Sequence, residues 1–549
     1  MSKIQYDALI VGSGAAGAFA AKELTSQGLS VLMLEAGPAV GPKDFVSQKQ
    51  KPKHAINLTE RALATLKGQP IQSRALFFSK QLAHFFVNDL KNPYTTPKGE
   101  PFLWVRGRQE GGRTHSFGRV LIRWTDDDFK IATRAGRGKD WPFSYDEIEP
   151  FYQEVEKSLG LSGNKDNVGT MPDSHYARPA TLTKAEMVFK TKVETKDASQ
   201  NVIAWPLVPP TKDRMLAPMR EAKASGLLTL IHDAVVRRVL TDDADQASGV
   251  EYIDRLSKTA HIVEAKNVVL CASPVETIRL LLNSASSRHP NGLANSSDAV
   301  GRYFMDQIPC LAAGVFPECR GQEVNTSAPK DDFYGPSGGV FIPRAERDIS
   351  DRSEFAVQTS FGRAPVNSPD ADARFSLFAF AQMLPYADNR ITLNPRRKDA
   401  WGIPVPHIRC VMHDTEKALI NDVQAEVLDM YEDAGAVFEF IGTPLGLREM
   451  GRGGFPDADP ISRFLFRTMF TKSMCMGSAI HEAGGAIMGD DPKDSVLNTW
   501  GQTWDIPNLY ITDASAFPGS GVSGTTLTVM AQTLRACRHL AQRYKGDRV

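Results

Sequence analysis

Hydrophobic and polar positions follow one another along the chain in blocks that predict an α/β protein. Residues 8–11 form a short apolar run that predicts a buried parallel strand. Residues 15–27 are compatible with a helix, which we expect to end at Gly28. A second apolar strand follows and ends at Glu35. The chain therefore begins with a strand–turn–helix–strand unit.

Similar patterns predict elements further along the chain. Helices are expected at 147–159 with Ser144 as N-cap, 274–283, 414–434 and 526–543. Buried strands are expected at 267–273 and 509–513, and a small antiparallel sheet at 227–231, 235–240, 249–254 and 260–263. Polar stretches rich in proline and glycine predict surface or lid loops at 317–340, 362–373 and 442–460.

The distribution of these elements predicts two domains. At 549 residues the chain is too long for one simple core. Strands typical of a nucleotide-binding domain occur at its start, middle and end. We therefore predict a Rossmann-like α/β domain assembled from separated segments, with a second domain, a sheet covered by helices, over it. The first domain is expected at 1–155, 226–305 and 473–549, and the second, substrate-binding domain at 156–225 and 306–472.

Composition and charge narrow the class of protein. The chain is 42% hydrophobic and 23% charged, as in ordinary soluble globular proteins. Lys plus Arg (64) balances Asp plus Glu (64), which gives no reason to expect nucleic acid or acidic membranes as partners. No apolar run approaches the roughly 18 residues that span a bilayer. Since the first strand begins almost at once, no signal peptide is expected, and a cytoplasmic protein is predicted.

The cysteines and histidines show no metal-ligand spacing. The six cysteines contain no CxxC pair and are expected to be reduced, mostly buried thiols. His407 and His413 lie on either side of Cys410, but no third and fourth ligand follows at a suitable spacing. No metal site is therefore predicted.

The turn after the first strand carries the most specific signal. Gly12, Gly14 and Gly17 supply a tight turn, close backbone approach to a pyrophosphate, and tight packing of helix on strand. The helix N-terminus offers N–H groups and a positive dipole end to phosphates. Glu35 lies 23 residues after Gly12, where a carboxylate can hydrogen-bond an adenosine ribose. The sequence therefore predicts a dinucleotide site.

Three further segments are rich in small residues around polar ones. Residues 106–118 form a glycine-rich loop suited to close contact with a planar or anionic ligand. Residues 478–489 place His481 among residues too small to shield it. Asp513 ends a strand beside a helix N-terminus, another natural phosphate or flavin-edge site.

Together with the N-terminal turn, these segments resemble the glucose–methanol–choline (GMC) family of FAD-dependent oxidoreductases. The resemblance spans most of the chain, although 305–470 carries little recognisable pattern. The Gly111-Gly112 and Trp141-Pro-Phe segments look most like those of bacterial sugar and glycoside dehydrogenases. The resemblance implies that an alcohol gives a hydride to flavin N5 while His481 takes the hydroxyl proton. Electrons would then pass to oxygen, a quinone or a redox protein.

The resemblance also implies which residues meet the cofactor. These predicted FAD-binding residues are Gly12, Gly14, Ala15, Ala16, Gly17, Glu35, Ala36, Arg106, Gly111, Gly112, Thr114, His115, Ser116, Val236, Ala272, Ser273, Asp513, Ala514 and Thr525. Family members with a histidyl–flavin bond carry that histidine four residues past the Gly-Gly pair, which is Ser116 here. We therefore expect non-covalent FAD, with His115 either contacting the flavin or packing. Most of the arginines at 106, 108, 113, 119 and 123 are expected to be ion-paired or solvated.

The sequence departs from the family at one catalytic position. The second catalytic residue, a His or Asn, normally lies eleven residues after the aspartate, and here that position is Gly524. Ser523 or Thr525 could replace it, a residue from the substrate domain could reach in, or the reaction could differ from ordinary alcohol oxidation. The glycine could also serve a positive φ or substrate volume. Gly524 leaves open a flavin-retaining lyase or an enzyme acting on an aromatic or terpenoid alcohol. A flavin oxidase is a further alternative, because nothing in the sequence separates it from a dehydrogenase.

Overall fold

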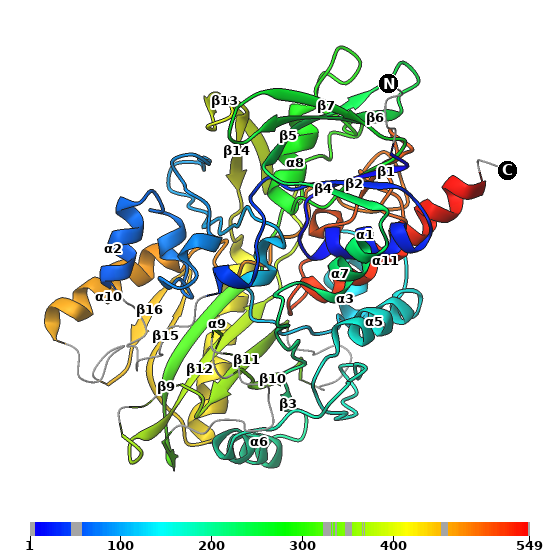
Figure 1. Cartoon of the computed structure of the whole chain (residues 1–549). Helices are drawn as coiled ribbons and strands as arrows, with labels where there is room; N and C mark the ends of the chain where they lie inside the picture. The colour runs from blue at the N-terminus through cyan, green and yellow to red at the C-terminus, as the bar shows by residue number, and fades with distance from the viewer. Residues whose placement is uncertain are drawn as a thin grey trace.

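The computed structural model describes residues 6–45, 58–321, 331, 333–334, 337–345, 354–364, 366, 368–451 and 459–546. Within these ranges the chain forms two main layers of sheet (Figure 1). A parallel sheet with its helices lies near the two chain ends, and a long antiparallel sheet extends away from it. The mixed α/β architecture agrees with the fold class predicted from the sequence.

The parallel sheet has the strand order β17-β8-β1-β2-β4. Its strands are β1 (Ala8–Val11), β2 (Val31–Leu34), β4 (Leu228–Ile231), β8 (Val268–Leu270) and β17 (Leu509–Ile511). All neighbouring pairs are parallel. The predicted strands at the start, middle and end of the chain therefore do meet in one sheet. The prediction for 227–231 was wrong in one respect, because β4 pairs with β2 and not with the antiparallel strands that follow it.

Helices cover this sheet. Three of them are α1 (Ala15–Ser26), α5 (Tyr145–Leu159) and α11 (Thr526–Gly546). The helix α11 packs against both α1 and α5. As predicted, Ser144 caps α5, and its N–H donates to the Glu147 carboxylate at 3.0 Å. The helix α7 (Ala217–Ala224) packs on α1. The last part of the predicted second-domain segment 156–225 therefore contacts a helix of the parallel sheet.

Beside the parallel sheet lies a smaller antiparallel one, at the top of Figure 1. It consists of β5 (Ala234–Thr241), β6 (Ala247–Asp254) and β7 (Ala260–Glu264) in that order, as predicted. The helix α8 (Pro274–Asn283) contacts β5 and the hairpin of β13 (Arg390–Lys398) and β14 (Pro404–Arg409). This hairpin thus packs on the nucleotide-binding side, although 306–472 was assigned to the second domain.

The second sheet has seven strands in the order β16-β15-β9-β12-β11-β10-β3. They are β3 (Ile203–Ala204), β9 (Ile308–Arg320), β10 (Val340–Ile342), β11 (Phe355–Phe361), β12 (Asp372–Ala381), β15 (Val437–Thr443) and β16 (Gly446–Glu449). The helices α6 (Lys184–Lys196) and α9 (Asp414–Asp433) pack on it. Parts of the predicted loops 317–340 and 442–460 are therefore strand, and 322–330 and 452–458 lie outside the described residues.

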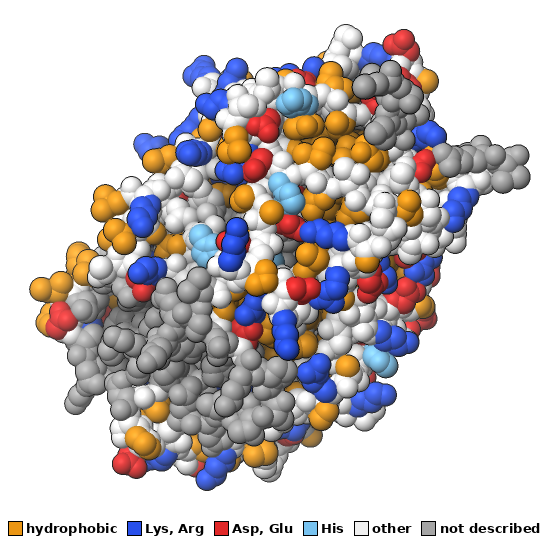
Figure 2. Space-filling model, viewed as in Figure 1, with side chains coloured by type: hydrophobic (Ala, Val, Ile, Leu, Met, Phe, Trp, Pro, Cys, Tyr) orange, Lys and Arg blue, Asp and Glu red, His pale blue; other side chains and the backbone are white. Residues whose placement is uncertain are grey.

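The remaining elements are short or peripheral. They are the helices α2 (Leu58–Leu66), α3 (Asp126–Phe129), α4 (Ile131–Ala135) and α10 (Pro460–Ser473), and the 3-10 turns η1 (Pro42–Asp44), η2 (Gln72–Arg74), η3 (Ala83–Phe85), η4 (Gly112–His115) and η5 (Ala514–Ala516). Figure 2 shows acidic and basic side chains interspersed on the visible face, with hydrophobic ones gathered over α2 and α10. No helix in the described ranges is long and apolar enough to cross a membrane.

Candidate active site

The glycine turn lies where three parallel strands end. Gly12 follows β1 with φ of +101°, and a Cβ on it would lie 2.5 Å from the Cys271 carbonyl oxygen at the end of β8. A Cβ on Gly17 would collide with the Gly12 carbonyl. Both positions therefore require glycine for the chain's own packing. Ligands of parallel sheets bind at this carboxyl edge.

Gly14 differs from its two neighbours in the turn. A Cβ built on it meets no protein atom within 4 Å, and its φ of −70° suits any residue. It forms the N-cap of α1 without a side-chain hydrogen bond, so the helix offers its first N–H groups and dipole to an anion. The open cradle beside a bare helix N-terminus fits the pyrophosphate of a dinucleotide.

The second glycine-rich loop packs directly on this turn. The Gly111 N–H donates to Ser13 Oγ at 3.1 Å, and a Cβ on Gly112 would lie 3.5 Å from the Gly14 Cα. Thr114 follows in η4, and its hydroxyl donates to the Gly111 carbonyl at 2.6 Å. Two segments about a hundred residues apart thus form one continuous surface, as a flavin dinucleotide needs.

Glu35 is buried directly after β2 and holds the turn together. Its carboxylate accepts from the Ser13 hydroxyl at 2.6 Å and from the Gly37 N–H at 2.9 Å. Burial raises the pKa of this carboxyl, while these hydrogen bonds oppose the shift. Ala36 packs beside β5, the strand that carries Val236. The position of Glu35 is compatible with the predicted ribose contact, which stays a prediction.

Asp513 joins the ends of two other strands. Its carboxylate accepts from the Ser515 N–H at 2.9 Å, so that Asp513 caps η5. The same carboxylate accepts from the Ser273 N–H at 3.1 Å. Ser273 adopts a φ of +77°, rare for a residue with a side chain. The predicted sites Ala272–Ser273 and Asp513–Ala514 therefore lie together at the same edge as the glycine turn.

The residues after the Gly-Gly pair occupy different surroundings. The His115 ring stacks on Phe85 at 5.4 Å between centroids, and its Nε2 lies 2.8 Å from the Glu110 carbonyl oxygen. Ser116 ends η4 with its hydroxyl 3.4 Å from the Arg113 carbonyl. His115 thus packs into an aromatic cluster.

The basic stretch is mostly ion-paired, in line with the sequence prediction. Arg108, Arg113 and Arg123 contact the carboxylates of Glu276, Glu482 and Glu156 at 2.7–2.8 Å. Arg106 stacks over Trp104 with its guanidinium carbon 3.5 Å from the ring centroid. Arg119 is the remaining case. It is 6% exposed, has a φ of +57°, stacks over Tyr334 and contacts Ser337, but its Nε and Nη1 find no partner among the described residues.

His481 lies at the junction of the two sheets. The backbone N–H of His481 donates to the Asp306 carboxylate at 2.9 Å. The ring Nδ1 of His481 lies 2.6 Å from Gln307 Oε1. Both partners come just before β9, the long strand of the second sheet. The Phe380 ring packs against the imidazole at 4.7 Å. Sequence reasoning found His481 but missed Asp306 and Gln307, because nothing in the local pattern before β9 indicates what they contact.

The other ring nitrogen of His481 faces Gly524. A Cβ on Gly524 would lie 3.7 Å from His481 Nε2 and 3.9 Å from the Val120 carbonyl oxygen. The backbone of Gly524 is outside the left-handed region, so a positive φ is not the reason for glycine here. The carbonyl of Ser523 accepts from Trp124 Nε1 and Gln307 Nε2, and Thr525 directly precedes α11. Glycine thus leaves space next to the imidazole.

Burial and charge keep His481 neutral. Desolvation of the ring and, second, the nearby Arg113 guanidinium lower the pKa of His481 to about 3. Burial and then the Glu482 charge raise the pKa of Asp306 to about 8. A neutral imidazole with an accessible nitrogen is the form that accepts a proton.

This environment predicts a flat pH dependence for any step in which His481 acts as base. Since the imidazole stays unprotonated above its lowered pKa, the rate should not change between about pH 5 and 8, where an unperturbed histidine of pKa about 6.5 would gain activity. Stopped-flow measurement of substrate-dependent flavin bleaching across this range tests the expectation. A rise with a midpoint near 6.5 would contradict it.

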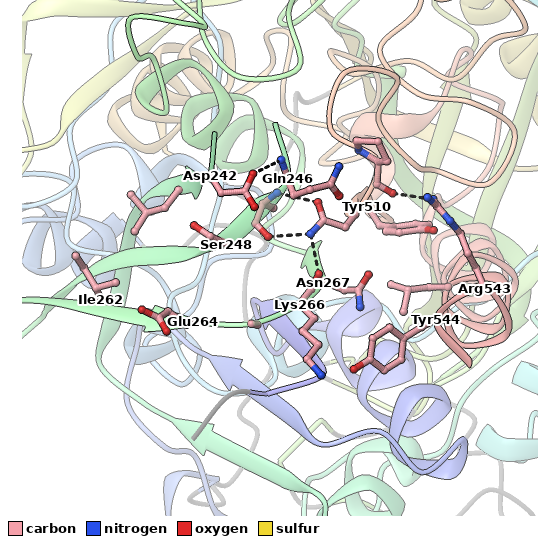
Figure 3. A pocket seen from close by; sticks show the side chains of 16 residues that line it. Asp242, Gln246, Ser248, Ile262, Glu264, Lys266, Asn267, Tyr510, Arg543 and Tyr544 are labelled. Atoms are coloured by element: carbon pink, nitrogen blue, oxygen red, sulfur yellow. Dashed lines mark hydrogen bonds between the residues drawn. The ribbon is translucent and has the colours of Figure 1, made fainter. Parts of the chain in front are cut away.

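A pocket of about 590 Å³, shown in Figure 3, is lined by neither the glycine turn nor His481. It is lined by residues that precede β8 and β17, including Lys266 and Asn508. The Asn508 amide donates to the Lys266 carbonyl at 2.7 Å and Arg543 donates to the Pro507 carbonyl at 2.9 Å. This pocket therefore opens at the amino edge of the strands, opposite the glycine turn. The described residues contain no group of three potential metal ligands.

Comparison with known proteins shows the family of the chain. Family models described as GMC oxidoreductase match residues 6–308 and 385–533. Fructose dehydrogenase large subunit of Gluconobacter japonicus is 26% identical, with 96% of each chain covered. 2-Methyl-1,2-propanediol dehydrogenase of Mycolicibacterium austroafricanum is 28% identical, with 98% of this chain and 96% of the relative covered. The structure of Aspergillus oryzae RIB40 formate oxidase shares the fold, with a TM-score of 0.66 at 15% identity over 100% of both chains.

Proposed function

The chain belongs to the GMC oxidoreductase family, and we propose that it oxidises a CH–OH group of a sugar, glycoside or related polyol with FAD as its cofactor. The observation that carries this proposal is the bare side of the His481 imidazole, whose Nε2 faces the backbone of Gly524. Because Gly524 carries no side chain, this side of the ring is left for a substrate hydroxyl.

The residues present would hold FAD along one surface. Gly14 and the start of α1 would bind the pyrophosphate, and Glu35 the ribose. Gly111–Gly112 and the Asp513–Ala514 edge would lie along the flavin end. When bound, FAD supplies the acceptor for the hydride that leaves the alcohol carbon.

The protein's own part in the reaction is proton transfer and positioning. His481 Nε2 would take the hydroxyl proton as the carbon-bound hydride leaves, so that no full alkoxide has to form in advance. The half-buried Arg113 guanidinium, held at 2.8 Å from the buried Glu482 carboxylate, places a positive charge near the imidazole, which adds to desolvation in disfavouring its protonation before substrate binds. The carbonyl of Val120 flanks the same space.

Substrate class is inferred from the polar surroundings and from the relatives. Arg119 precedes Val120 in the chain, and its buried guanidinium lies over the Tyr334 ring and on Ser337, with Nε and Nη1 left without partners among the described residues. Buried donors need acceptors, and hydroxyl-rich ligands supply several. The relatives are named for acting on fructose and on 2-methyl-1,2-propanediol, a sugar and a diol.

Anaerobic flavin bleaching tests the proposal. The holoenzyme is mixed with a panel of sugars, glycosides, aliphatic diols and benzylic alcohols, and the loss of flavin absorbance is followed. We expect bleaching by one of the first three classes. Exclusive response to benzylic alcohols would contradict it. Admission of oxygen then separates a flavin oxidase, which reoxidises rapidly, from a dehydrogenase that needs a quinone or a redox protein.

We further propose that FAD is held without a covalent bond. Ser116 occupies the attachment position, and the His115 ring is packed against Phe85. Acid precipitation should therefore release the flavin into the supernatant, measured by its absorbance. Flavin that stays with the pelleted protein would show that a residue of this loop is attached to it.

A cytoplasmic location is also proposed. None of the cysteines in the described ranges forms a disulfide, and five of them are buried, which suits a reducing compartment. Fractionation of the source cells with an antibody against the protein tests it, and recovery in an extracellular or membrane fraction would contradict it.

A further inference from the structure

Gln307 is a fully buried side chain between the two sheets, with every polar atom used. Its Nε2 donates to the carbonyls of Ser520 and Ser523, both at 2.7 Å. Its Oε1 lies 2.6 Å from His481 Nδ1. A single amide thus connects the imidazole to the loop that carries Gly524.

The two carbonyls determine which way this amide points. If the amide were flipped, Oε1 would face two carbonyl oxygens, and acceptors would oppose acceptors. The NH₂ group therefore points to Ser520 and Ser523, and the oxygen points to His481. An amide oxygen can only accept, so Nδ1 of His481 must carry a hydrogen.

We propose that Gln307 is a positioning residue that selects the Nδ1-protonated tautomer of His481 and so leaves Nε2 as the base facing Gly524. The proposal deepens the proposed function and rests on it only in assigning the proton transfer to Nε2. The hydrogen-bond geometry applies to the protein whatever its substrate.

The charged groups around the ring do not compete for this role. Asp306 contacts the backbone N–H of His481, and Glu482 is bonded to Arg113. Phe380, whose ring packs against the imidazole, is apolar. Gln307 is therefore the side chain that the described structure places on a ring nitrogen of His481.

Nuclear magnetic resonance of ¹⁵N-histidine-labelled holoenzyme tests the proposal directly. The His481 signals are identified by their loss in His481→Gln. We expect a protonated Nδ1 and an unprotonated Nε2 at neutral pH. A ring protonated at Nε2 in the parent protein would overturn the proposal. This measurement needs no substrate, so it is independent of whether the proposed function is right.

Gln307→Met supplies the second arm, because it keeps the length but removes the acceptor. We expect the Nδ1-protonated form to lose its dominance in the NMR spectrum. Flavin reduction should slow by between about 10-fold and 10⁴-fold, the latter being the effect of a wrong histidine tautomer in a Ser-His-Asp triad. KM should change little. An unchanged tautomer in a folded Gln307→Met protein would contradict the proposal.

Trp124→Phe is the matched control. Trp124 Nε1 donates to the same Ser523 carbonyl at 3.3 Å. The described structure shows no hydrogen bond between Trp124 and His481. If Gln307 acted only by anchoring the loop, both variants would change the tautomer alike. We expect Trp124→Phe to keep the parental His481 signals.

Discussion

Replacing His481 with alanine is expected to slow flavin reduction by about 10²–10⁴-fold, the usual contribution of one positioned general base. The loss should appear in the limiting reduction rate and much less in substrate affinity, because a base acts mainly in the transition state. Stopped-flow bleaching at saturating substrate measures it.

His261→Ala is a suitable control for this prediction. His261 lies on β7, stacked on Tyr252 at 5.1 Å, far along the chain from the site and exposed. It should reduce its flavin at the parental rate. A His481→Ala protein that does the same would remove His481 from the mechanism and leave the substrate's proton to another group.

Gly14→Val is expected to remove most FAD binding while the apoprotein still folds. The backbone of Gly14 suits any residue and no protein atom lies within 4 Å of an added Cβ, so the fold has no reason to change. The added methyl groups would instead occupy the space that the turn leaves for the pyrophosphate. Overpacking of about 1–3 kcal/mol corresponds to roughly 5- to 160-fold weaker binding.

Titration of apoprotein with FAD, followed by quenching of flavin fluorescence, measures this effect. Gly546→Val is the control, since Gly546 also has open space around it but ends α11 away from the turn. Gly17→Ala should behave differently, because its Cβ collides with the Gly12 carbonyl and the melting temperature of the apoprotein itself should fall. Parental FAD affinity in Gly14→Val would show that the pyrophosphate binds elsewhere.

Local chemistry was sufficient to predict the elements that begin and end the chain. The first strand, the glycine turn and α1 follow from an apolar run, from positions where a Cβ has no room, and from a helix that ends next to Gly28. The N-cap of α5 at Ser144 likewise depends only on residues within one turn. Such features are short-range, so the amino-acid pattern determines them.

Long-range pairing could not be predicted in the same way. The strand β4 has the same apolar character as β5, yet it pairs with β2, nearly two hundred residues earlier, and α7 packs on α1 although it follows a segment of the second sheet. An apolar pattern predicts that a segment forms a strand of a sheet. It does not identify the neighbouring strand, because many pairings bury the same surface.

The residues of the candidate site likewise differ in whether the sequence alone could identify them. His481, Asp513 and the glycine segments could be found in the sequence because each stands in a distinctive run of small residues. Gln307 could not, since its meaning comes from two carbonyls and an imidazole that lie more than 170 residues away. The sequence by itself determined which groups could do the chemistry. Only the tertiary structure decided which nitrogen of His481 is bare and what it faces, because hydrogen-bond direction depends on neighbours that folding brings together.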